Sequence, residues 1–319
     1  MISFIIIGKN EGWKLTKCLE SVFKTIKQSN ITLYEVIYVD SNSKDDSIGR
    51  ANAFVRVRIY QITGICNAAI ARNIGAKESR GDVLFFIDGD MEIMHDFLPL
   101  VYDSSSELKY NFVSGNLLNI NYDYYGNIVS KQNTTYNNIK DKFEVTTGGI
   151  FLIKRNLWLR MSGMKTKLVY NEDLDFGIRL AKSENKLYRK KEIIAKHHTI
   201  PSNDRYRMWK FLFSKSELYR AVLLRDNFFN VHQWTYFLRG NYTLFMLLFL
   251  ILVSVQFHCI LLVLLYFPLI MIRIISRKEY TVRLIISRIF YFLIYEPALF
   301  FAFFLFWPKK NKEKYICIK

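Results

Sequence analysis

Residues 81–92 are Gly81-Asp82-Val83-Leu84-Phe85-Phe86-Ile87-Asp88-Gly89-Asp90-Met91-Glu92. Val83–Ile87 is an unbroken apolar run, which is typical of a strand buried on both faces of a parallel sheet. Asp88 and Asp90 follow it, so we expect both carboxylates at the C-terminal edge of the sheet, where open α/β sheets bind ligands. Two interpretations fit this stretch alone. One is a metal-nucleotide site, because Mg²⁺ is often held by carboxylates and substrate phosphates; the other is an ordinary Asp-Gly turn.

Strands and helices alternate along the chain before this stretch. Three apolar runs with the character of buried strands are separated by segments with helical spacing of apolar residues. The expected strands are Ile2–Gly8, Tyr34–Val39 and Val55–Tyr60, and the expected helices are Trp13–Ile26 and Asn67–Glu78. This order predicts βαβ units and a mostly parallel sheet.

The pattern becomes less regular after Asp90. We expect a helix over Phe97–Leu108 and a strand over Phe112–Ile120. Tyr122–Lys140 is rich in Asn, Tyr and Gly, which predicts a hairpin or a mobile loop over the site. Glu172–Lys182 has helical spacing and three acids in its first turn, where acids suit the positive end of a helix dipole.

The composition sets broad limits on function. The chain has 319 residues, a formal net charge of +17 and half of its residues hydrophobic. This length allows one sizeable α/β domain and a smaller part, and the positive charge suits either nucleic acid or an anionic membrane surface. The four cysteines have no close pair, which disfavours a zinc site or a disulfide framework and fits a reducing, cytosolic environment.

Six short motifs, taken in order, resemble family 2 glycosyltransferases of the GT-A fold, a Rossmann-like α/β fold. They are Ile5-Ile6-Ile7-Gly8-Lys9-Asn10-Glu11, Val39-Asp40-Ser41-Asn42-Ser43, Ala71-Arg72-Asn73-Ile74-Gly75-Ala76, Asp88-Gly89-Asp90, Thr147-Gly148-Gly149 and Asn171-Glu172-Asp173. The resemblance covers about the first 200 residues and implies a catalytic domain over residues 1–203. It also implies a nucleotide-sugar donor, either a UDP-sugar or a GDP-sugar, a divalent metal, Mn or Mg, and inversion at the anomeric carbon.

The resemblance assigns roles to particular side chains. Asp88 and Asp90 would hold the metal on the donor diphosphate, since the cation stabilises the charge of the departing group. Asp40 matches the acid that reads the nucleobase, and Arg72 would face the donor. The residues expected to contact the nucleotide sugar are Gly8, Glu11, Asp40, Arg72, Asp88, Gly89 and Asp90.

Inversion by direct displacement needs a general base on the acceptor hydroxyl. Asp173 matches the base of the family, and a helix N-terminus would keep it ionised. Glu172 is the second candidate, and Gly148 and Gly149 would let a donor or acceptor sugar approach the backbone closely. His198 matches a histidine that completes the metal shell in many GT-A enzymes; the other interpretation of this histidine is a surface residue.

The last third of the chain has the composition of a membrane attachment. Residues 204–239 mix basic and aromatic side chains, as interfacial amphipathic helices do. Gly240–Ile272 contains no charged residue, and Ile289–Pro308 is broken only by Glu296-Pro297. Both runs suit a membrane region of two or more spans over residues 240–308, either multi-pass or built on a hairpin that turns near Gln256-Phe257-His258.

Basic residues flank these runs, which predicts a basic cytosolic tail over residues 309–319 and a cytoplasmic catalytic domain at the cell membrane. The chain contains no Gln-x-x-Arg-Trp motif, which marks processive synthases of this family, so transfer of a single sugar is expected. The expected acceptor is a lipid-linked saccharide in cell-surface polysaccharide or glycolipid assembly, and the alternative is polyisoprenyl phosphate itself. A non-catalytic sugar-nucleotide scaffold would have lost acids that are all present here. Nucleic-acid binding rests on charge alone, and no nucleic-acid partner is expected.

Overall fold

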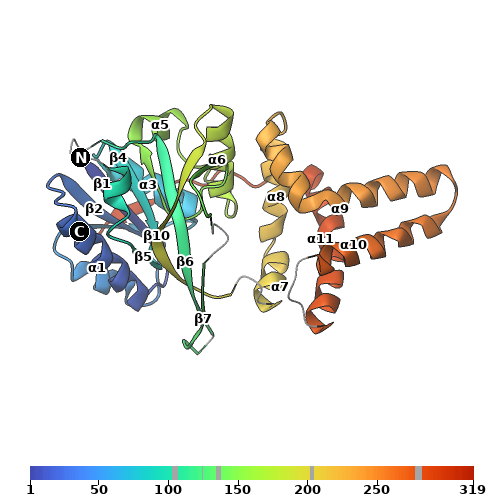
Figure 1. Cartoon of the computed structure of the whole chain (residues 1–319), viewed down its shortest axis with the longest axis horizontal. Coiled ribbons are helices and arrows are strands. Elements are labelled where there is room, and N and C mark those ends of the chain that lie inside the picture. The colour runs from blue at the N-terminus through green and yellow to red at the C-terminus, as the bar shows by residue number, and fades with distance from the viewer. Residues whose placement is uncertain (103–106, 124, 134–137, 202–204, 277–281) are drawn as a thin grey trace. The chain divides into compact units, whose positions relative to one another are not determined.

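The computed structural model describes residues 1–102, 107–123, 125–133, 138–201, 205–276 and 282–319. The chain forms two compact units (Figure 1). The first comprises Met1–Pro201 together with Lys309–Lys319, and the second comprises Ser202–Pro308. The domain boundary predicted between residues 203 and 204 lies outside the described residues.

One mixed sheet forms the centre of the first unit. Its described strands run in the order β11-β3-β2-β1-β4-β9-β6-β10-β5, with β7 added beside β6 and β8 beside β10. The four strands β3, β2, β1 and β4 are parallel, as are β6 and β10. Strand bounds are β1 Ile2–Gly8, β2 Tyr34–Asp40, β3 Val57–Ile62, β4 Val83–Asp88, β5 Met91–Ile93, β6 Phe112–Tyr122, β7 Ile128–Asn133, β8 Lys142–Glu144, β9 Phe151–Lys154, β10 Leu187–Thr199 and β11 Tyr315–Cys317.

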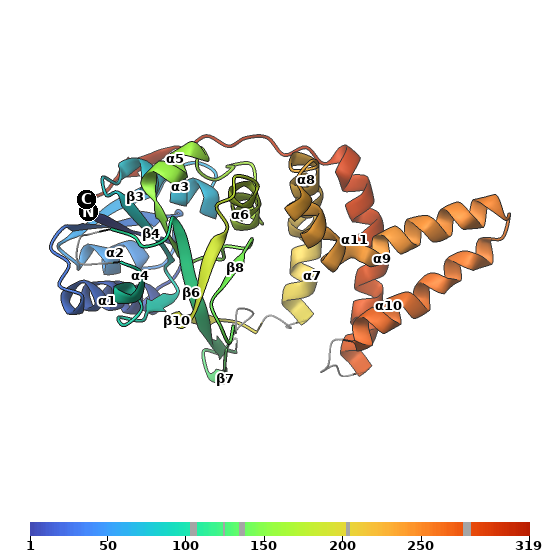
Figure 2. The ribbon, with the colours of Figure 1, turned by 45° about the horizontal axis from the view of Figure 1, so that its top comes forward.

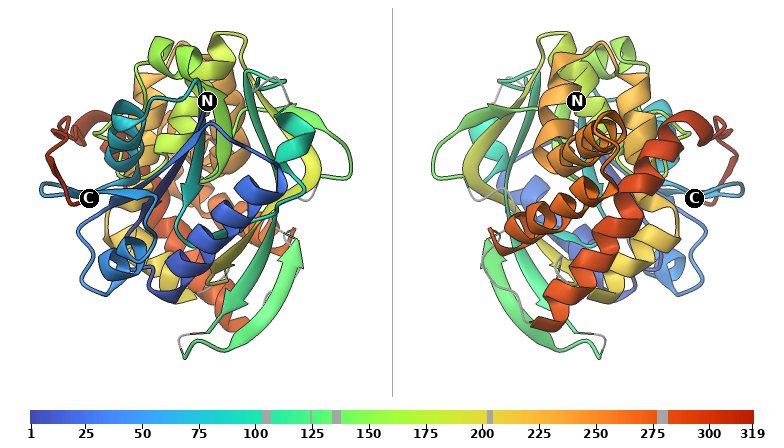
Figure 3. Two further views of the ribbon diagram at one scale, coloured as in Figure 1. Left: turned by 90° about the vertical axis from the view of Figure 1, so that its left-hand side faces the viewer. Right: turned by 90° about the vertical axis from the view of Figure 1, so that its right-hand side faces the viewer.

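Helices cover both faces of this sheet (Figure 3). Alternate residues of β1 point to opposite faces: Phe4 packs in one core cluster with Leu15 of α1, and Ile5 packs in the other with Ile70 of α3. The helices of this unit are α1 Trp13–Gln28, α2 Ser47–Asn52, α3 Ala68–Glu78, α4 Leu98–Val101, α5 Arg155–Arg160 and α6 Glu172–Lys182. The predicted GT-A-type α/β sheet is confirmed.

Two predicted elements differ in detail. The helix expected over Phe97–Leu108 is only α4, because Tyr102 is extended and forms a β-bridge to Leu108; residues 103–106 lie outside the described part. The polar segment 122–140 forms a hairpin in its described residues, with β7 antiparallel to β6. A hairpin is one of the two forms that the composition of this segment predicts.

The C-terminal segment is part of the first unit, whereas the sequence analysis treated residues 309–319 as a basic tail. Strand β11 pairs antiparallel with β3, and Tyr315 lies opposite Ile62. The Tyr315 hydroxyl donates to Glu78 Oε1 at 2.6 Å. The Thr166 hydroxyl donates to the Asn311 carbonyl at 2.7 Å. Edge pairing with β3 and these side-chain hydrogen bonds hold the segment on the first unit, and neither is visible in its basic and polar sequence pattern.

The second unit is helical. Its elements are α7 Arg205–Phe213, the short 3₁₀ helix η1 Ser216–Leu218, α8 Tyr219–Asp226, α9 Val231–Gln256, the 3₁₀ helix η2 Ile260–Leu265, α10 Tyr266–Ile275 and α11 Val282–Leu305. Helix α9 runs across the boundary predicted between residues 239 and 240, but it is kinked there, with non-helical dihedral angles at Asn241.

Helices α9 and α10 form the hairpin that the sequence offered as one of two forms (Figure 2). The chain turns after Gln256, with His258 in a left-handed conformation at φ 52°. Large apolar side chains near the tip are exposed, including Val255, Phe257 and Ile260. Within the described residues, α9 and α11 are long and apolar enough to cross a membrane.

Candidate functional site

The candidate site lies where β1 and β4 end. Ile7 of β1 lies opposite Asp88 of β4, and the Gly89 amide donates to the Ile7 carbonyl at 2.7 Å. A side chain at Gly89 would meet Glu11 and Ile7 at 3.1 and 3.2 Å. The loop after β1, which holds Gly8 and Glu11, therefore packs directly on the Asp88-Gly89-Asp90 turn.

Arg72 connects two acids of the site. Its side chain projects from α3 and is almost completely buried. Nη2 lies 2.7 Å from Asp88 Oδ1, and Nη1 lies 3.0 Å from Glu172 Oε1. Arg72 is predicted to face the donor, and in the structure its guanidinium forms ion pairs with two carboxylates. Arg72 therefore positions the end of β4 against the start of α6.

The site concentrates negative charge. Burial, reinforced by the charge of Asp90, raises the pKa of Glu11 to about 7. Burial also raises the pKa of Asp88 to about 6, although Arg72 opposes this shift. A carboxylate is expensive to bury without a cation. The turn therefore has the electrostatic character of a cation site.

The imidazole of His197, and not that of His198, lies against the Asp90 carboxylate. His197 Nε2 is 3.3 Å from Asp90 Oδ2, and this contact holds the pKa of Asp90 below its ordinary value despite burial. Successive side chains of a strand point to opposite faces, so His198 on β10 points away from that carboxylate. His198 Nδ1 is 2.9 Å from the Tyr122 hydroxyl, and Nε2 is 3.4 Å from Glu92.

Of the three residues predicted to hold the metal, Asp88 and Asp90 lie on one turn, whereas the His198 side chain lies against Tyr122 and Glu92. Among the described residues, no group of three or more His, Cys, Asp or Glu side chains is arranged to hold a metal ion. Asp90 Oδ1 is nevertheless buried without a hydrogen-bond partner. Mg²⁺ sites commonly use one or two carboxylates and complete their shell with water and substrate phosphate. The unsatisfied carboxylate oxygen of Asp90 fits a metal of that kind, and the His197 imidazole beside it would add a nitrogen ligand for a softer divalent ion.

Asp40 lies at the end of β2, one strand away from β1. Its carboxylate is fully buried and accepts from the Tyr38 hydroxyl at 3.0 Å and the Ser43 amide at 2.9 Å. Gln61 Nε2 donates to it from β3 at 3.3 Å. The Ser43 hydroxyl is a fourth donor to this carboxylate. A nucleobase that binds Asp40 has to replace one of these four donors, and Gln61 holds the longest of the contacts.

Helix α6 places two acids at its N-terminus. Asn171, the residue before the helix, adopts a left-handed conformation with φ 62°. Glu172 is buried against Arg72, and burial with the neighbouring charge of Asp173 raises the pKa of Glu172 to about 7. Asp173 is half-buried, and its carboxylate accepts a hydrogen bond from the local Leu174 amide at 2.7 Å. Of the two acids, Asp173 has the less engaged carboxylate.

The Gly148–Gly149 pair approaches the acidic turn. Gly148 has φ 74°, a conformation that favours glycine. A Cβ atom on Gly149 would lie 1.9 Å from Asp88 Oδ2, so no side chain fits there while Asp88 keeps its position. The Thr147 hydroxyl donates to the Asp173 carbonyl at 3.1 Å. This loop therefore connects the turn after β4 with the start of α6.

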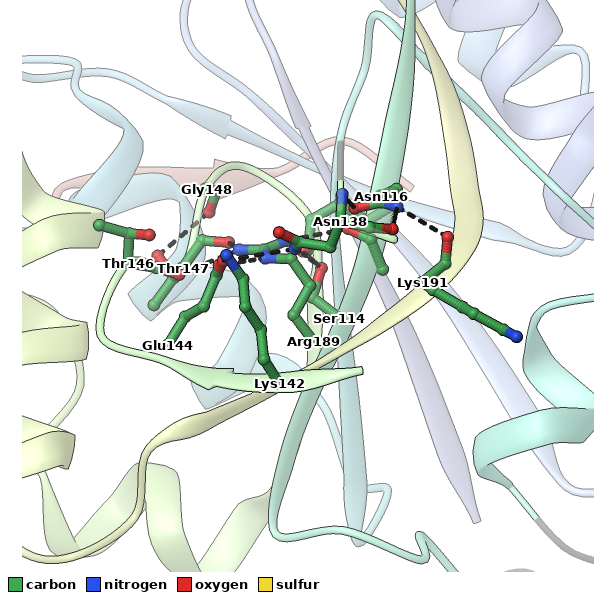
Figure 4. A network of polar contacts seen from close by, with 12 residues as sticks. Ser114, Asn116, Asn138, Lys142, Glu144, Thr146, Thr147, Gly148, Arg189 and Lys191 are labelled. Carbon is green, nitrogen blue, oxygen red and sulfur yellow. Dashed lines mark hydrogen bonds and ion pairs between the residues drawn. The ribbon is translucent and has the colours of Figure 1, made fainter. Parts of the chain in front are cut away.

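A buried arginine that the sequence analysis did not single out supports this loop (Figure 4). Arg189 Nη2 donates to the carbonyls of Thr146 and Thr147 at 3.0 and 3.2 Å, and Nη1 donates to the Gly115 carbonyl at 2.8 Å. Its charge is balanced by Glu144 at 2.5 Å. Side chains of a strand alternate between its two faces, so Arg189 lies on the same face of β10 as buried Leu187. This spacing is the feature of the sequence from which the burial of Arg189 could have been predicted.

The model of the family described as Glycosyl transferase family 2 matches residues 3–166. An uncharacterized glycosyltransferase of Haemophilus influenzae is 25% identical over 185 residues, which are 56% of this chain and 62% of that protein. The poly(ribitol-phosphate) beta-N-acetylglucosaminyltransferase TarP of Staphylococcus aureus is 30% identical over 121 residues, 36% of either chain. The matches thus span between about a third and three fifths of these relatives' lengths.

Solved structures with the same fold include GalNAc-T7 in complex with UDP, GalNAc and Mn²⁺. It has a TM-score of 0.52 and 16% identity, and the match covers 63% of this chain and 44% of that one. S. aureus TarS 1–349 in complex with UDP has a TM-score of 0.51 and 14% identity, with coverage of 76% and 74%. At these identities the likeness establishes the fold.

Proposed function

The chain belongs to glycosyltransferase family 2, and on that premise we propose that it transfers a single sugar from a nucleotide-sugar donor to a membrane-associated acceptor. The transfer inverts the anomeric carbon and uses a divalent metal, Mn or Mg. The observation that carries the proposal is the convergence on Arg72 of Asp88, from the end of β4, and Glu172, which precedes Asp173 on α6. This arrangement brings a donor-binding turn and a base candidate to one edge of the sheet.

The proposed donor is a UDP-sugar. TarP is named as an N-acetylglucosaminyltransferase, and TarS has been solved with UDP-GlcNAc. Asp40 with Gln61 would bind the base, and Gly8 and Glu11 would line the nucleoside pocket. Asp88, Gly89 and Asp90 would lie at the diphosphate, with the metal held by Asp90 and His197. A metal at this position offsets the negative charge that grows on the departing diphosphate.

Asp173 is the proposed general base. It accepts the proton of the acceptor hydroxyl while that oxygen bonds to the anomeric carbon and the bond to the diphosphate breaks. The N-terminus of α6 stabilises the ionised carboxylate before transfer. Glu172 is held by Arg72, so it positions the site and does not take the proton. Gly148 and Gly149 leave room for the sugar beside the acids.

The proposed acceptor is a lipid-linked saccharide, with polyisoprenyl phosphate as the alternative. Helices α9 and α11 have the length and composition of membrane spans. The basic and aromatic residues of α7 and α8 suit an anionic headgroup layer, at about 1 kcal/mol per basic residue near the surface. The enzyme would therefore act at the cytoplasmic face of the cell membrane.

The function is tested with the full chain in detergent and a panel of UDP- and GDP-sugars with Mn²⁺ or Mg²⁺. We expect one donor to raise the melting temperature, because a ligand that binds only the folded state stabilises it by about 2.7 kcal/mol at 100 times its Kd. The same donor should be hydrolysed slowly, with release of the inverted sugar observed by NMR, and chelation should stop the reaction. Binding without turnover by any donor would favour a non-catalytic scaffold.

A second prediction concerns the two histidines. His197→Ala is expected to weaken the affinity for Mn²⁺ in the presence of UDP by at least about tenfold, because it removes the imidazole beside Asp90. His198→Gln should leave that affinity unchanged, because its side chain contacts Tyr122 and Glu92. Isothermal titration with Mn²⁺ measures both variants. A loss of Mn²⁺ affinity in His198→Gln alone would assign the metal ligand to His198, as the family motif predicts.

A further inference from the structure

The helical unit contains a polar cavity of about 220 Å³. It is lined by residues of α7, η1, α8, α9, α10 and α11. Its charged and hydroxyl-bearing residues are Glu217, Arg220, Arg273, Arg288, Tyr291 and Tyr295. Ionisable side chains are expensive in a unit with so much exposed apolar surface, and such residues commonly mark a functional site.

The cavity has an excess of positive charge. Arg220 Nε lies 2.9 Å from Glu217 Oε2, and Arg273 Nη1 lies 2.6 Å from Glu296 Oε1. Glu296 is fully buried and also accepts hydrogen bonds from the hydroxyls of Thr243 and Tyr266. Among the described residues, three arginines and one carboxylate, Glu217, line the cavity, and Glu296 lies behind Arg273. The lining therefore attracts an anion.

The cavity lies at the base of the α9–α10 hairpin. Gly240 begins the uncharged run of the hairpin, and Arg273 is the first charged residue after it. The kink at Asn241 leaves the Gly240 carbonyl available, and this carbonyl accepts a hydrogen bond from Arg273. The two legs of the hairpin are therefore joined where its apolar surface ends. In an inserted hairpin this level is that of the lipid headgroups.

Chain topology requires the hairpin to insert from the side of the membrane on which the first unit lies. The chain leaves the first unit after Pro201 and returns to it at Lys309, where β11 pairs with β3. Residues 202–308 must therefore cross a membrane an even number of times. A hairpin that enters and leaves from one side meets this condition, and its base stays at the surface from which it enters.

We propose that this cavity binds the phosphate group of a membrane lipid. Guanidinium groups bind phosphate through charge-assisted, often bidentate hydrogen bonds, and the cavity offers several of them. A second, apolar cavity of about 190 Å³ is lined by α8, α9 and α11, including Leu244, Phe300 and Phe303, and offers a surface for hydrocarbon. The proposal rests on the proposed function in one respect only, that a phosphate-bearing lipid is the acceptor.

The test measures binding of the full chain in detergent to polyisoprenyl phosphate, to polyisoprenol without phosphate and to inorganic phosphate. Arg220→Gln and Arg288→Gln are each expected to weaken binding of polyisoprenyl phosphate by at least about tenfold. Arg239→Gln is the matched control, because Arg239 is exposed, precedes Gly240 and does not line the cavity. Polyisoprenol should bind weakly and equally to all variants.

Three results would overturn the proposal: an equal loss in Arg239→Gln, tight binding of polyisoprenol, or binding of inorganic phosphate as tight as that of the lipid. The first would mean general electrostatic attraction, and the last would mean a site for free phosphate. Stabilisation by the nucleotide sugar is measured on the same variants and should be unchanged. Loss of lipid binding with intact donor binding separates this cavity from the proposed catalytic site.

Discussion

Asp173→Asn is expected to lower the rate of sugar transfer by about 10²–10⁴-fold, the range that general acid–base catalysis contributes. The amide is isosteric with the carboxylate but cannot take a proton from the acceptor hydroxyl. Its side-chain oxygen can still accept the hydrogen bond from the Leu174 amide. The fold and the donor affinity should therefore be retained, and the loss should appear in kcat.

Glu172→Gln is the informative comparison, because it changes the adjacent acid on the same helix turn. Glu172 pairs with buried Arg72 at 3.0 Å, and Arg72 also pairs with Asp88. This variant should lose donor affinity and stability, because removing one partner leaves the buried arginine without part of its compensating charge.

Initial rates at saturating donor, with the donor Kd measured separately by titration, distinguish the two variants. The opposite result, with turnover intact in Asp173→Asn and abolished in Glu172→Gln at unchanged donor affinity, would assign the base to Glu172.

The part of the fold that follows from hydrophobic pattern was predictable. Val83–Ile87 has no polar break, and it forms a strand in the middle of the sheet with Asp88 at its end. The regular spacing of apolar residues in Trp13–Ile26 likewise predicts α1. These features depend on local sequence periodicity, so they can be read without knowing the partners of each element.

Features set by long-range pairing were not predictable in the same way. Strand β11 depends on an open edge at β3, more than 250 residues earlier in the chain, as the pairing of Tyr315 with Ile62 shows. The choice between His197 and His198 depends on which face of β10 meets Asp90, and a one-residue shift reverses that face. The ion pairs of Arg72 depend on how α3 and α6 pack, which no local motif specifies.

Gly149→Ala is expected to remove most of the donor affinity measured in the presence of Mn²⁺. The added methyl group would lie 1.9 Å from Asp88 Oδ2 and 2.7 Å from Asp88 Cγ. Either the Thr147–Gly149 loop or the Asp88 carboxylate has to move. Asp88 is held by Arg72 at 2.7 Å, so its displacement also breaks a buried ion pair. Overpacking of this kind costs about 1–3 kcal/mol of stability.

Gly64→Ala provides the matched control, because its Cβ atom would meet only the side chain of Lys314, at 3.4 Å or more. Urea unfolding and donor titration are measured for both variants, and the control should match the parent protein in both. Adding Asp88→Ala to Gly149→Ala removes the whole clashing carboxyl group, so the two substitutions should destabilise less together than the sum of their separate effects. Strict additivity, or an unchanged donor Kd in Gly149→Ala, would mean that the loop does not form the wall of the donor site. Non-additivity with loss of donor binding would instead establish that the absence of a side chain at residue 149 is what allows Asp88 to remain beside Arg72.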